Sequence, residues 1–176
     1  MIRTTKRLKS TLLFLLLSVT AFPQESNTKA YPLQADVQTL DGIIKAYYDV
    51  ISGPVGQPRD WERDTSLHHP DALITITGKD KSKNSYISTQ TLSEYHKSFG
   101  VPKTGFWEYE INRETQTFGN ITHVWSTYET KEEQNGPVTQ RGINSIQLYH
   151  DGTRWWILSW MFDSERADNP IPKKHQ

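Results

Sequence analysis

Two adjacent histidines and a nearby aspartate form the first group of side chains that could bind a metal or move a proton. His68 and His69 precede Asp71, at the point where a helical pattern gives way to an extended one. Adjacent side chains of an extended segment point in opposite directions, so two neighbouring histidines rarely bind one ion. We therefore interpret the segment as a turn whose polar groups cap the backbone, with Asp71 as the cap.

His123 is a second candidate for acid–base chemistry near neutral pH. It alternates with Ile121 and Trp125, which places all three side chains on one face of a strand. If that face is concave, His123 lines a pocket; if it is convex, His123 meets solvent or a dimer partner. His96, next to Tyr95 in a helical segment, is expected on a solvated edge.

Two polar residues on a later strand are candidates for binding a carbonyl or a carboxylate. Arg141 and Asn144 lie on opposite faces of that strand, so one of them should point inward. The alternative is cross-strand pairing on the outside with Glu129 or Glu108. The sequence leaves both possibilities open.

Two acidic residues, Glu108 and Glu110, share the polar face of an earlier strand with Asn112. The residues between them are bulky and apolar, so the alternation separates a polar face from an apolar one. We expect the polar face to be solvated rather than catalytic.

Aromatic residues are the remaining candidates for a ligand site. The chain has six Trp, eight Tyr and six Phe, and no Cys. In a small domain without disulfides such rings supply core area, and they also line pockets for flat or apolar ligands. The residues expected to line a pocket are Tyr47, Tyr48, Trp61, Trp107, Trp125, Arg141 and Trp160, and those considered for catalysis are His123, Tyr48 and Asn144.

The helices that position these residues follow from hydrophobic spacing and turn signals. Apolar residues recur every three or four positions over 35–52, which predicts a helix that Gly53-Pro54 ends. A short helix over 59–67, a strand over 72–77 and an exposed loop over 78–84 follow. A capping box at Thr91 and Glu94 predicts a third helix over 91–99.

Four strands are expected between residues 105 and 166. Bulky residues alternate there in four runs, and turn-forming clusters at 119–120, 134–137 and 151–152 separate the runs. Such a meander after helices predicts a curved sheet over a helical layer, with a pocket in the concavity. The segment 167–176 has nothing to bury and is expected to be a loose tail.

The N-terminus has the pattern of a secretory signal peptide. Basic residues precede an apolar run from Leu12 to Val19, and the small residue Ala21 follows. The run is shorter than the ~20 residues that a membrane-spanning helix needs. We expect residues 1–24 to be a signal peptide, 25–34 a flexible leader and 35–166 a single domain that is secreted or periplasmic.

Charge and cysteine content exclude several classes of function. Four of the 20 basic residues lie in the first 24, so the mature chain has 16 Lys and Arg against 20 Asp and Glu, a net charge of −4. That balance argues against a nucleic-acid partner, which usually leaves a basic footprint. The lack of cysteine excludes disulfides, thiolate metal sites and lipid attachment at cysteine.

Three stretches, in this order, resemble the nuclear transport factor 2-like superfamily, which includes the SnoaL-like polyketide cyclases and the ketosteroid isomerases. They are 44–53 at the end of the first helix, 61–72 with its Pro-Asp-Ala step into a strand, and 119–129 followed by Asp151-Gly152. The resemblance spans nearly all of the mature domain and suggests a secreted bacterial member. It implies an α+β fold with three N-terminal helices packed on a strongly curved, mainly antiparallel sheet, a cone-shaped barrel that encloses a pocket.

The resemblance also shows what is missing for ketosteroid isomerase chemistry. The position of the isomerase's general base falls near Ile76, which cannot move a proton. Its oxyanion-hole tyrosine corresponds to Tyr47 or Tyr48, and its second carboxylic acid to Asn144 or Ser145. The sequence therefore holds no complete catalytic constellation of this type.

We expect a protein that binds a small, partly apolar molecule in an aromatic-lined pocket, without a metal or an organic cofactor. One alternative is a cofactor-independent isomerase, cyclase or hydrolase that uses a histidine or tyrosine of the pocket. Another is an interaction domain, with a homodimer formed through the sheet.

Overall fold

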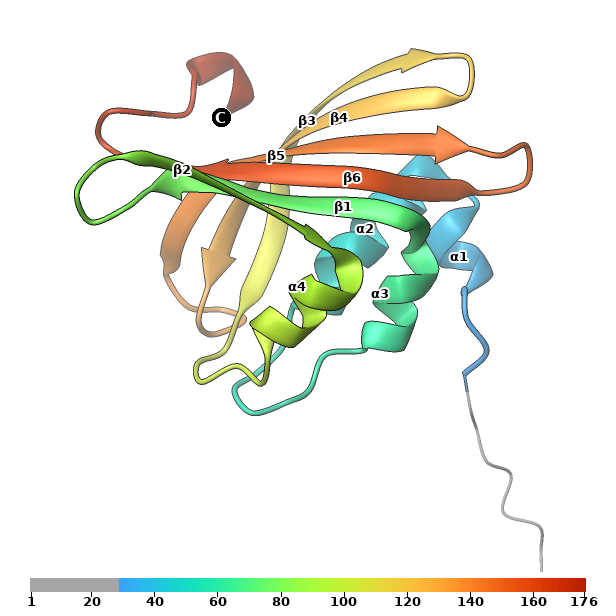
Figure 1. Ribbon diagram of the computed structural model, residues 1–176, viewed down its shortest axis with the longest axis horizontal. Helices are drawn as coiled ribbons and strands as arrows, with labels where there is room; N and C mark the ends of the chain where they lie inside the picture. The colour runs from blue at the N-terminus through green and yellow to red at the C-terminus, as the bar shows by residue number, and fades with distance from the viewer. Residues whose placement is uncertain (1–28) are drawn as a thin grey trace, which may run out of the picture.

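The computed structural model describes residues 29–176 (Figure 1). The expected signal peptide, residues 1–24, lies outside the described residues. The helices are α1 (Gln34–Val37), α2 (Leu40–Ile51), α3 (Trp61–Leu67), α4 (Leu92–Phe99) and the 3-10 helix η1 (Lys173–His175). The strands are β1 (His68–Lys79), β2 (Ser85–Thr91), β3 (Trp107–Phe118), β4 (Ile121–Lys131), β5 (Val138–His150) and β6 (Trp155–Ser164). The expected α+β class and the four C-terminal strands are confirmed.

All strands belong to one sheet in the order β2-β1-β6-β5-β4-β3. Strands β1 and β6 are parallel, and the other neighbours are antiparallel. Helices α1 to α4 lie on one side of the curved sheet (Figure 1). The sheet has two free edges, β2 and β3, so it is an open cone rather than a closed barrel. None of the described helices has the length and apolar character needed to cross a membrane.

The first helical segment consists of two helices, where the apolar spacing predicted one. The break falls at Thr39, whose side chain accepts a hydrogen bond of 2.9 Å from the backbone N–H of Gly42. This N-cap satisfies one of the free N–H groups that begin α2. The short helix α1 packs alongside α2, so the amphipathic pattern continues across the break.

Helix α2 supplies the centre of the hydrophobic core. Ile43, Ile44 and Tyr47 are buried against the inner face of the sheet. That face contributes residues such as Ile146 and Trp160, which alternate with outward-facing neighbours along β5 and β6. Burial of such side chains stabilises a fold by roughly 1.5 to 3 kcal/mol each.

The region between α3 and α4 differs from the sequence-based expectation. Strand β1 begins at His68, so the histidine pair starts the strand instead of forming a turn before it. Strand β2 was not predicted, because it is a largely polar edge strand that pairs only with β1. Helix α4 begins at the predicted capping box, in which Thr91 and Glu94 bond each other's backbone N–H groups.

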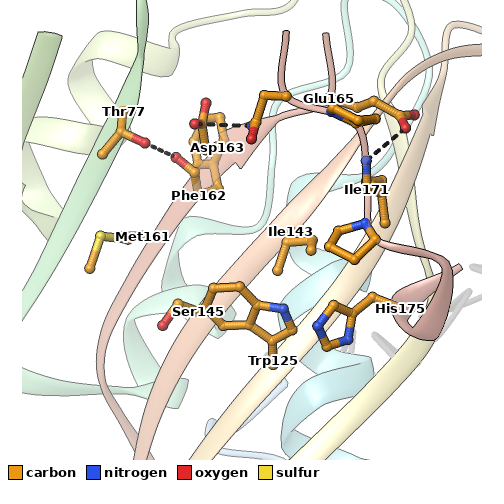
Figure 2. A pocket seen from close by; sticks show the side chains of 13 residues that line it. Thr77, Trp125, Ile143, Ser145, Met161, Phe162, Asp163, Glu165, Ile171 and His175 are labelled. Carbon is orange, nitrogen blue, oxygen red and sulfur yellow. Dashed lines mark hydrogen bonds between the residues drawn. The ribbon is translucent and has the colours of Figure 1, made fainter. Parts of the chain in front are cut away.

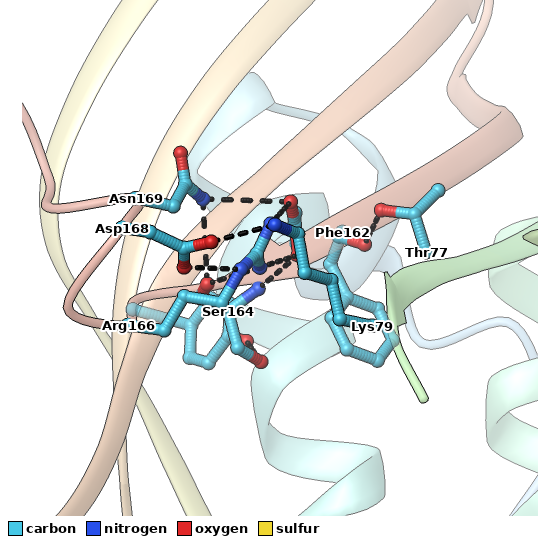
Figure 3. A network of polar contacts seen from close by, with 9 residues as sticks. Thr77, Lys79, Phe162, Ser164, Arg166, Asp168 and Asn169 are labelled. Atoms are coloured by element: carbon cyan, nitrogen blue, oxygen red, sulfur yellow. Dashed lines mark hydrogen bonds and ion pairs between the residues drawn. The ribbon is translucent and has the colours of Figure 1, made fainter. Parts of the chain in front are cut away.

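A network of ion pairs holds the C-terminal segment beside the outer face of the sheet (Figure 3). Arg166 donates two hydrogen bonds, of 2.6 and 3.0 Å, to the carboxylate of Asp163 at the end of β6. Lys79, at the end of β1, donates to Asp168 at 2.6 Å. The segment is therefore anchored to two neighbouring strands.

The segment beyond these anchors also buries side chains, contrary to the expectation of a loose tail with nothing to bury. Ile171 is 5% and His175 7% exposed. The backbone carbonyl of His175 accepts a hydrogen bond of 2.7 Å from the Thr127 hydroxyl on β4. The sequence shows no periodicity here, because the contacts depend on a sheet face formed elsewhere in the chain.

Candidate functional site

The alternation of side chains along β4 and β5 divides the candidate residues between two faces of the sheet. Asn144 points inward, under the helices, and is buried. Arg141 points outward and lies 3.7 Å from Glu165. His123 also points outward, with its Nε2 3.1 Å from the hydroxyl of Ser145. His123 therefore does not share a site with Tyr48 and Asn144, and the convex alternative holds for it.

A β-bulge in β3 decides where its acidic residues point. Glu108 pairs with Thr130 and Glu110 pairs with Tyr128, but the register shifts at Ile111, so that Asn112 pairs with Thr127. The two glutamates consequently face the helices, whereas Asn112 faces outward. The expectation of one solvated polar face was wrong, because the extra residue reverses the alternation after Glu110.

Glu108 is a buried acid on the inner face, with 8% of its surface exposed. Its Oε1 accepts a hydrogen bond of 3.1 Å from Nδ2 of Asn144. Burial raises the pKa of Glu108 to about 8, while the hydrogen bond from Asn144 acts in the opposite direction. The carboxyl group is thus mostly protonated at pH 7. Its Oε2 has no hydrogen-bond partner among residues 29–176, so a ligand can accept the proton there.

A chain of hydrogen bonds connects the buried acid to a second carboxylate. Asn144 Nδ2 donates to the Tyr48 hydroxyl at 3.1 Å, which lies 2.7 Å from the Ser126 hydroxyl. Ser126 donates in turn to Oε1 of Glu110. Because Ser126 gives its single hydroxyl proton to Glu110, Tyr48 must be the donor in its bond with Ser126. Burial, followed by the nearby Glu108, raises the pKa of Tyr48, so this hydroxyl stays protonated.

Of these groups, Tyr48, Glu108 and Glu110 line a pocket of about 560 Å³ between α2 and β3. The lining residues are Ile44, Lys45, Tyr48, Asp49, Ser52, Arg63, Trp107, Glu108, Tyr109, Glu110, Arg113 and Gln134. The charged side chains pair with one another: Lys45 with Asp49, Arg63 with Asp36, and Arg113 with Glu110. The pocket therefore combines one uncharged acid with a rim whose charges are compensated. We call it the α2–β3 pocket.

The expected pocket residues separate into several environments. Tyr48 and Trp107 line the α2–β3 pocket. Tyr47 and Trp160 contact each other edge to face, with ring centroids 5.6 Å apart, inside the core. Trp61 stacks on the ring of His96 between α3 and α4, at 4.3 Å. The inner aromatic residues are thus mostly core.

Trp125 belongs to a different cavity, on the outer face of the sheet. This cavity of about 400 Å³ lies between the sheet and the C-terminal segment. Figure 2 shows Trp125 and His175 side by side, with Ile143 and Met161 on the neighbouring strands. Its acidic residues Asp163 and Glu165 are engaged in the ion pairs described above. The outer cavity offers apolar surface but no uncommitted acid.

Ile76 occupies the inner face of β1, paired with Phe162 of β6. It supplies no acid or base, as the sequence indicates. The acids that the sequence analysis missed, Glu108 and Glu110, come from β3 instead. Their only signal was a pair of glutamates among aromatic residues, which the alternation alone assigned to solvent. Among residues 29–176, no group of three or more His, Asp or Glu side chains is placed to hold a metal ion.

No protein-family model and no curated protein matches the chain in sequence. Solved structures match it in fold. An NTF2-like (nuclear transport factor 2-like) protein from Cytophaga hutchinsonii has 14% identity and a TM-score of 0.53, over 72% of this chain and 99% of its own. A protein of unknown function with a cystatin-like fold from Nostoc punctiforme has 10% identity and a TM-score of 0.53, over 71% and 87%. The β subunit of a candidate aromatic-ring-hydroxylating dioxygenase from Novosphingobium aromaticivorans has 15% identity and a TM-score of 0.54, over 74% and 94%.

These likenesses cover most of each chain at low identity, so they concern the fold and not the activity. The chain has the nuclear transport factor 2-like fold.

Proposed function

We propose that this protein binds a small, neutral, partly apolar molecule with a carbonyl or similar acceptor oxygen in the α2–β3 pocket. One observation carries the proposal: Glu108 is buried beside the pocket, its pKa is raised to about 8, and Oε2 has no partner within the described residues. A protonated carboxyl group is a strong hydrogen-bond donor to an oxygen acceptor. A neutral ligand fits because the rim charges already pair with one another.

The binding test uses 4′-fluoroacetophenone, a small aromatic ketone, observed by ¹⁹F NMR. At pH 6.5 the protein should bind it, and 4-fluorotoluene, which lacks the oxygen, should bind more weakly. Affinity should fall above pH 8, because the ionised Glu108 can no longer donate. Glu108→Gln keeps a donor of similar shape and should bind without this pH dependence, whereas Glu108→Leu should lose the preference for the ketone. Equal binding of both probes by the wild type would refute the proposal.

A second candidate is a cofactor-independent isomerase or lyase in the same pocket. The hydrogen-bond chain from Glu108 to Glu110 favours it, because it places an acid and a carboxylate base at one site. Glu110 would take a proton from the carbon next to the carbonyl, and the electrons would move onto the carbonyl oxygen. Glu108 would stabilise that oxygen by donating its hydrogen bond, and Glu110 would return the proton to carbon.

Exchange of the methyl protons of acetophenone for deuterium in D₂O measures this proton transfer directly. An enzyme should accelerate the exchange, and Glu110→Gln should abolish the acceleration while the ketone still binds. If the ketone binds but the exchange is not accelerated, the binding proposal stands and proton abstraction from this class of ketone is excluded.

We also propose that the chain is secreted or periplasmic and forms a homodimer through the outer face of the sheet. The N-terminal pattern supports secretion. The exposed apolar side chains Leu73, Ile87 and Met161 on β1, β2 and β6 support self-association. Light scattering of the wild type and Met161→Glu tests the dimer, which the charge should weaken, and fractionation of cells that express the full chain tests secretion.

A further inference from the structure

A second polar pocket lies where the end of α3 and the starts of β1, α4 and β6 meet. Its volume is about 600 Å³. Its lining residues are Tyr31, Pro32, Thr65, Ser66, His68, His69, Pro70, Thr91, Leu92, Ser93, His96, Arg154 and Trp156. One arginine, three histidines and several hydroxyl groups contribute to this surface, and no aspartate or glutamate does. We call it the Arg154 pocket.

Arg154 is partly buried and has no carboxylate within ion-pair distance among residues 29–176. Its guanidinium carbon lies 3.6 Å from the centroid of the Trp156 ring. The Nε and Nη2 atoms donate to the backbone carbonyls of Trp155 and Ser66. Its Nη1 makes no hydrogen bond to the described residues. Partial burial lowers the pKa of Arg154, opposed by the charge of Asp151.

The other described arginines differ in this respect. Arg63, Arg113, Arg141 and Arg166 each pair with a carboxylate. Arg59 has no carboxylate partner, but its guanidinium donates to carbonyl groups just after α2, including those of Ile51 and Gly53. Arg154 alone among them combines an uncompensated charge with a nitrogen left without a partner.

The buried carboxylate near the pocket, that of Asp64, bonds a histidine and does not cancel the charge of Arg154. His96 Nε2 lies 2.6 Å from Oδ2 of Asp64, a carboxylate that is 1% exposed beneath the pocket. His68 Nδ1 lies 3.4 Å from Oδ1 of the same group. The hydrogen bond of His68 Nδ1, at 2.9 Å, is to the backbone carbonyl of Asp64, and Oδ1 has no hydrogen-bond partner among residues 29–176. The carboxylate of Asp64 is therefore hydrogen-bonded to His96 and does not pair with Arg154. The stacking of His96 on Trp61 further fixes its orientation.

The geometry points to a binding site for the oxyanion of a small organic acid, either a carboxylate or a phosphate, held by Arg154. A planar guanidinium with a free nitrogen matches both groups. The hydroxyl of Ser93, which makes no hydrogen bond to the described residues, offers a further donor at the pocket surface, whereas those of Ser66 and Thr91 already donate to the Arg63 carbonyl and to Glu94. The adjacent Trp156 ring offers a face for the apolar part of the ligand. This site does not depend on the function proposed for the α2–β3 pocket.

The test measures binding of benzoate and of inorganic phosphate by isothermal titration calorimetry, with benzyl alcohol as the uncharged control. The wild type should bind at least one anion and not the alcohol. Arg154→Gln should lower the affinity about 10-fold or more, the usual loss for a charged hydrogen bond. Arg154→Lys, which keeps the positive charge, should retain part of the anion affinity. Arg166→Gln removes a paired arginine elsewhere and should bind as the wild type does.

Preferential binding of benzoate would assign the site to carboxylates, and preferential binding of phosphate to phosphate esters. Circular dichroism shows whether Arg154→Gln folds. If it does not fold, Arg154→Lys and Trp156→Leu supply the comparison, and each should lose less anion affinity. Failure of the wild type to bind either anion at millimolar concentration would overturn the proposal. So would an equal loss in Arg154→Gln and Arg166→Gln. Glu108→Leu should leave anion binding unchanged, which separates this site from the α2–β3 pocket.

Discussion

Replacement of Glu108 by glutamine should change how the stability of the protein depends on pH. The folded protein holds the Glu108 proton up to about pH 8, whereas an unfolded chain releases it near the ordinary value of 4.5. Between these values the folded state binds one more proton than the unfolded state. Rising pH therefore lowers the free energy of unfolding, by about 1.36 kcal/mol per pH unit for this one group. Glutamine has no proton to lose, so the variant lacks this term.

The magnitude follows from the pH window. Between pH 5 and pH 8 the stability of Glu108→Gln relative to the wild type should rise by roughly 3 to 4 kcal/mol. Urea denaturation of both proteins at pH 5, 6, 7 and 8 measures the difference, in which other titrating groups cancel because both proteins contain them. Glu110→Gln provides the matched control on the same strand. A stability difference that is the same at pH 5 and pH 8 would refute the buried, protonated state of Glu108.

Three further substitutions test other parts of the structure, each by urea denaturation. Tyr48→Phe removes the hydroxyl between Asn144 and Ser126 and should cost about 1 to 3 kcal/mol, with weaker ketone binding; unchanged stability would show that the hydrogen-bond chain is not formed. Ile171→Ala should cost about 2 kcal/mol because the side chain is buried, whereas the exposed Val55→Ala should cost almost nothing; equal effects would mean that the C-terminal segment is not packed. Gly142→Ala would place a Cβ against the hydroxyl group of Tyr128 on β4, and we expect a loss of about 1 to 3 kcal/mol; a neutral effect would contradict this close approach.

Local patterns of sequence predicted much of the fold. The apolar spacing of residues 40–51 and the capping box at Thr91 depend only on neighbours within a few positions, and both features are present. The four C-terminal strands follow from alternation between turn clusters. The inward position of Asn144 was one of two possibilities that alternation left open.

The remaining features depend on pairing between distant segments. The bulge at Ile111 exists only in the register of β3 against β4, and it turns Glu108 and Glu110 inward. Likewise, His96 meets Asp64 across two helices, so its expected place on a solvated edge was wrong. In both cases a polar residue looked exposed because its partner lies far away in the sequence.

The central claim, that Glu108 is a protonated donor to a ligand in the α2–β3 pocket, is tested most directly by ¹³C NMR. The carboxyl carbon of Glu108, assigned by comparison with Glu108→Gln, is followed as pH is raised, with and without 4′-fluoroacetophenone. We predict titration with a pKa near 8 in the free protein and a higher pKa when the ketone is bound. Titration near 4.5 with no response to the ketone would contradict the claim.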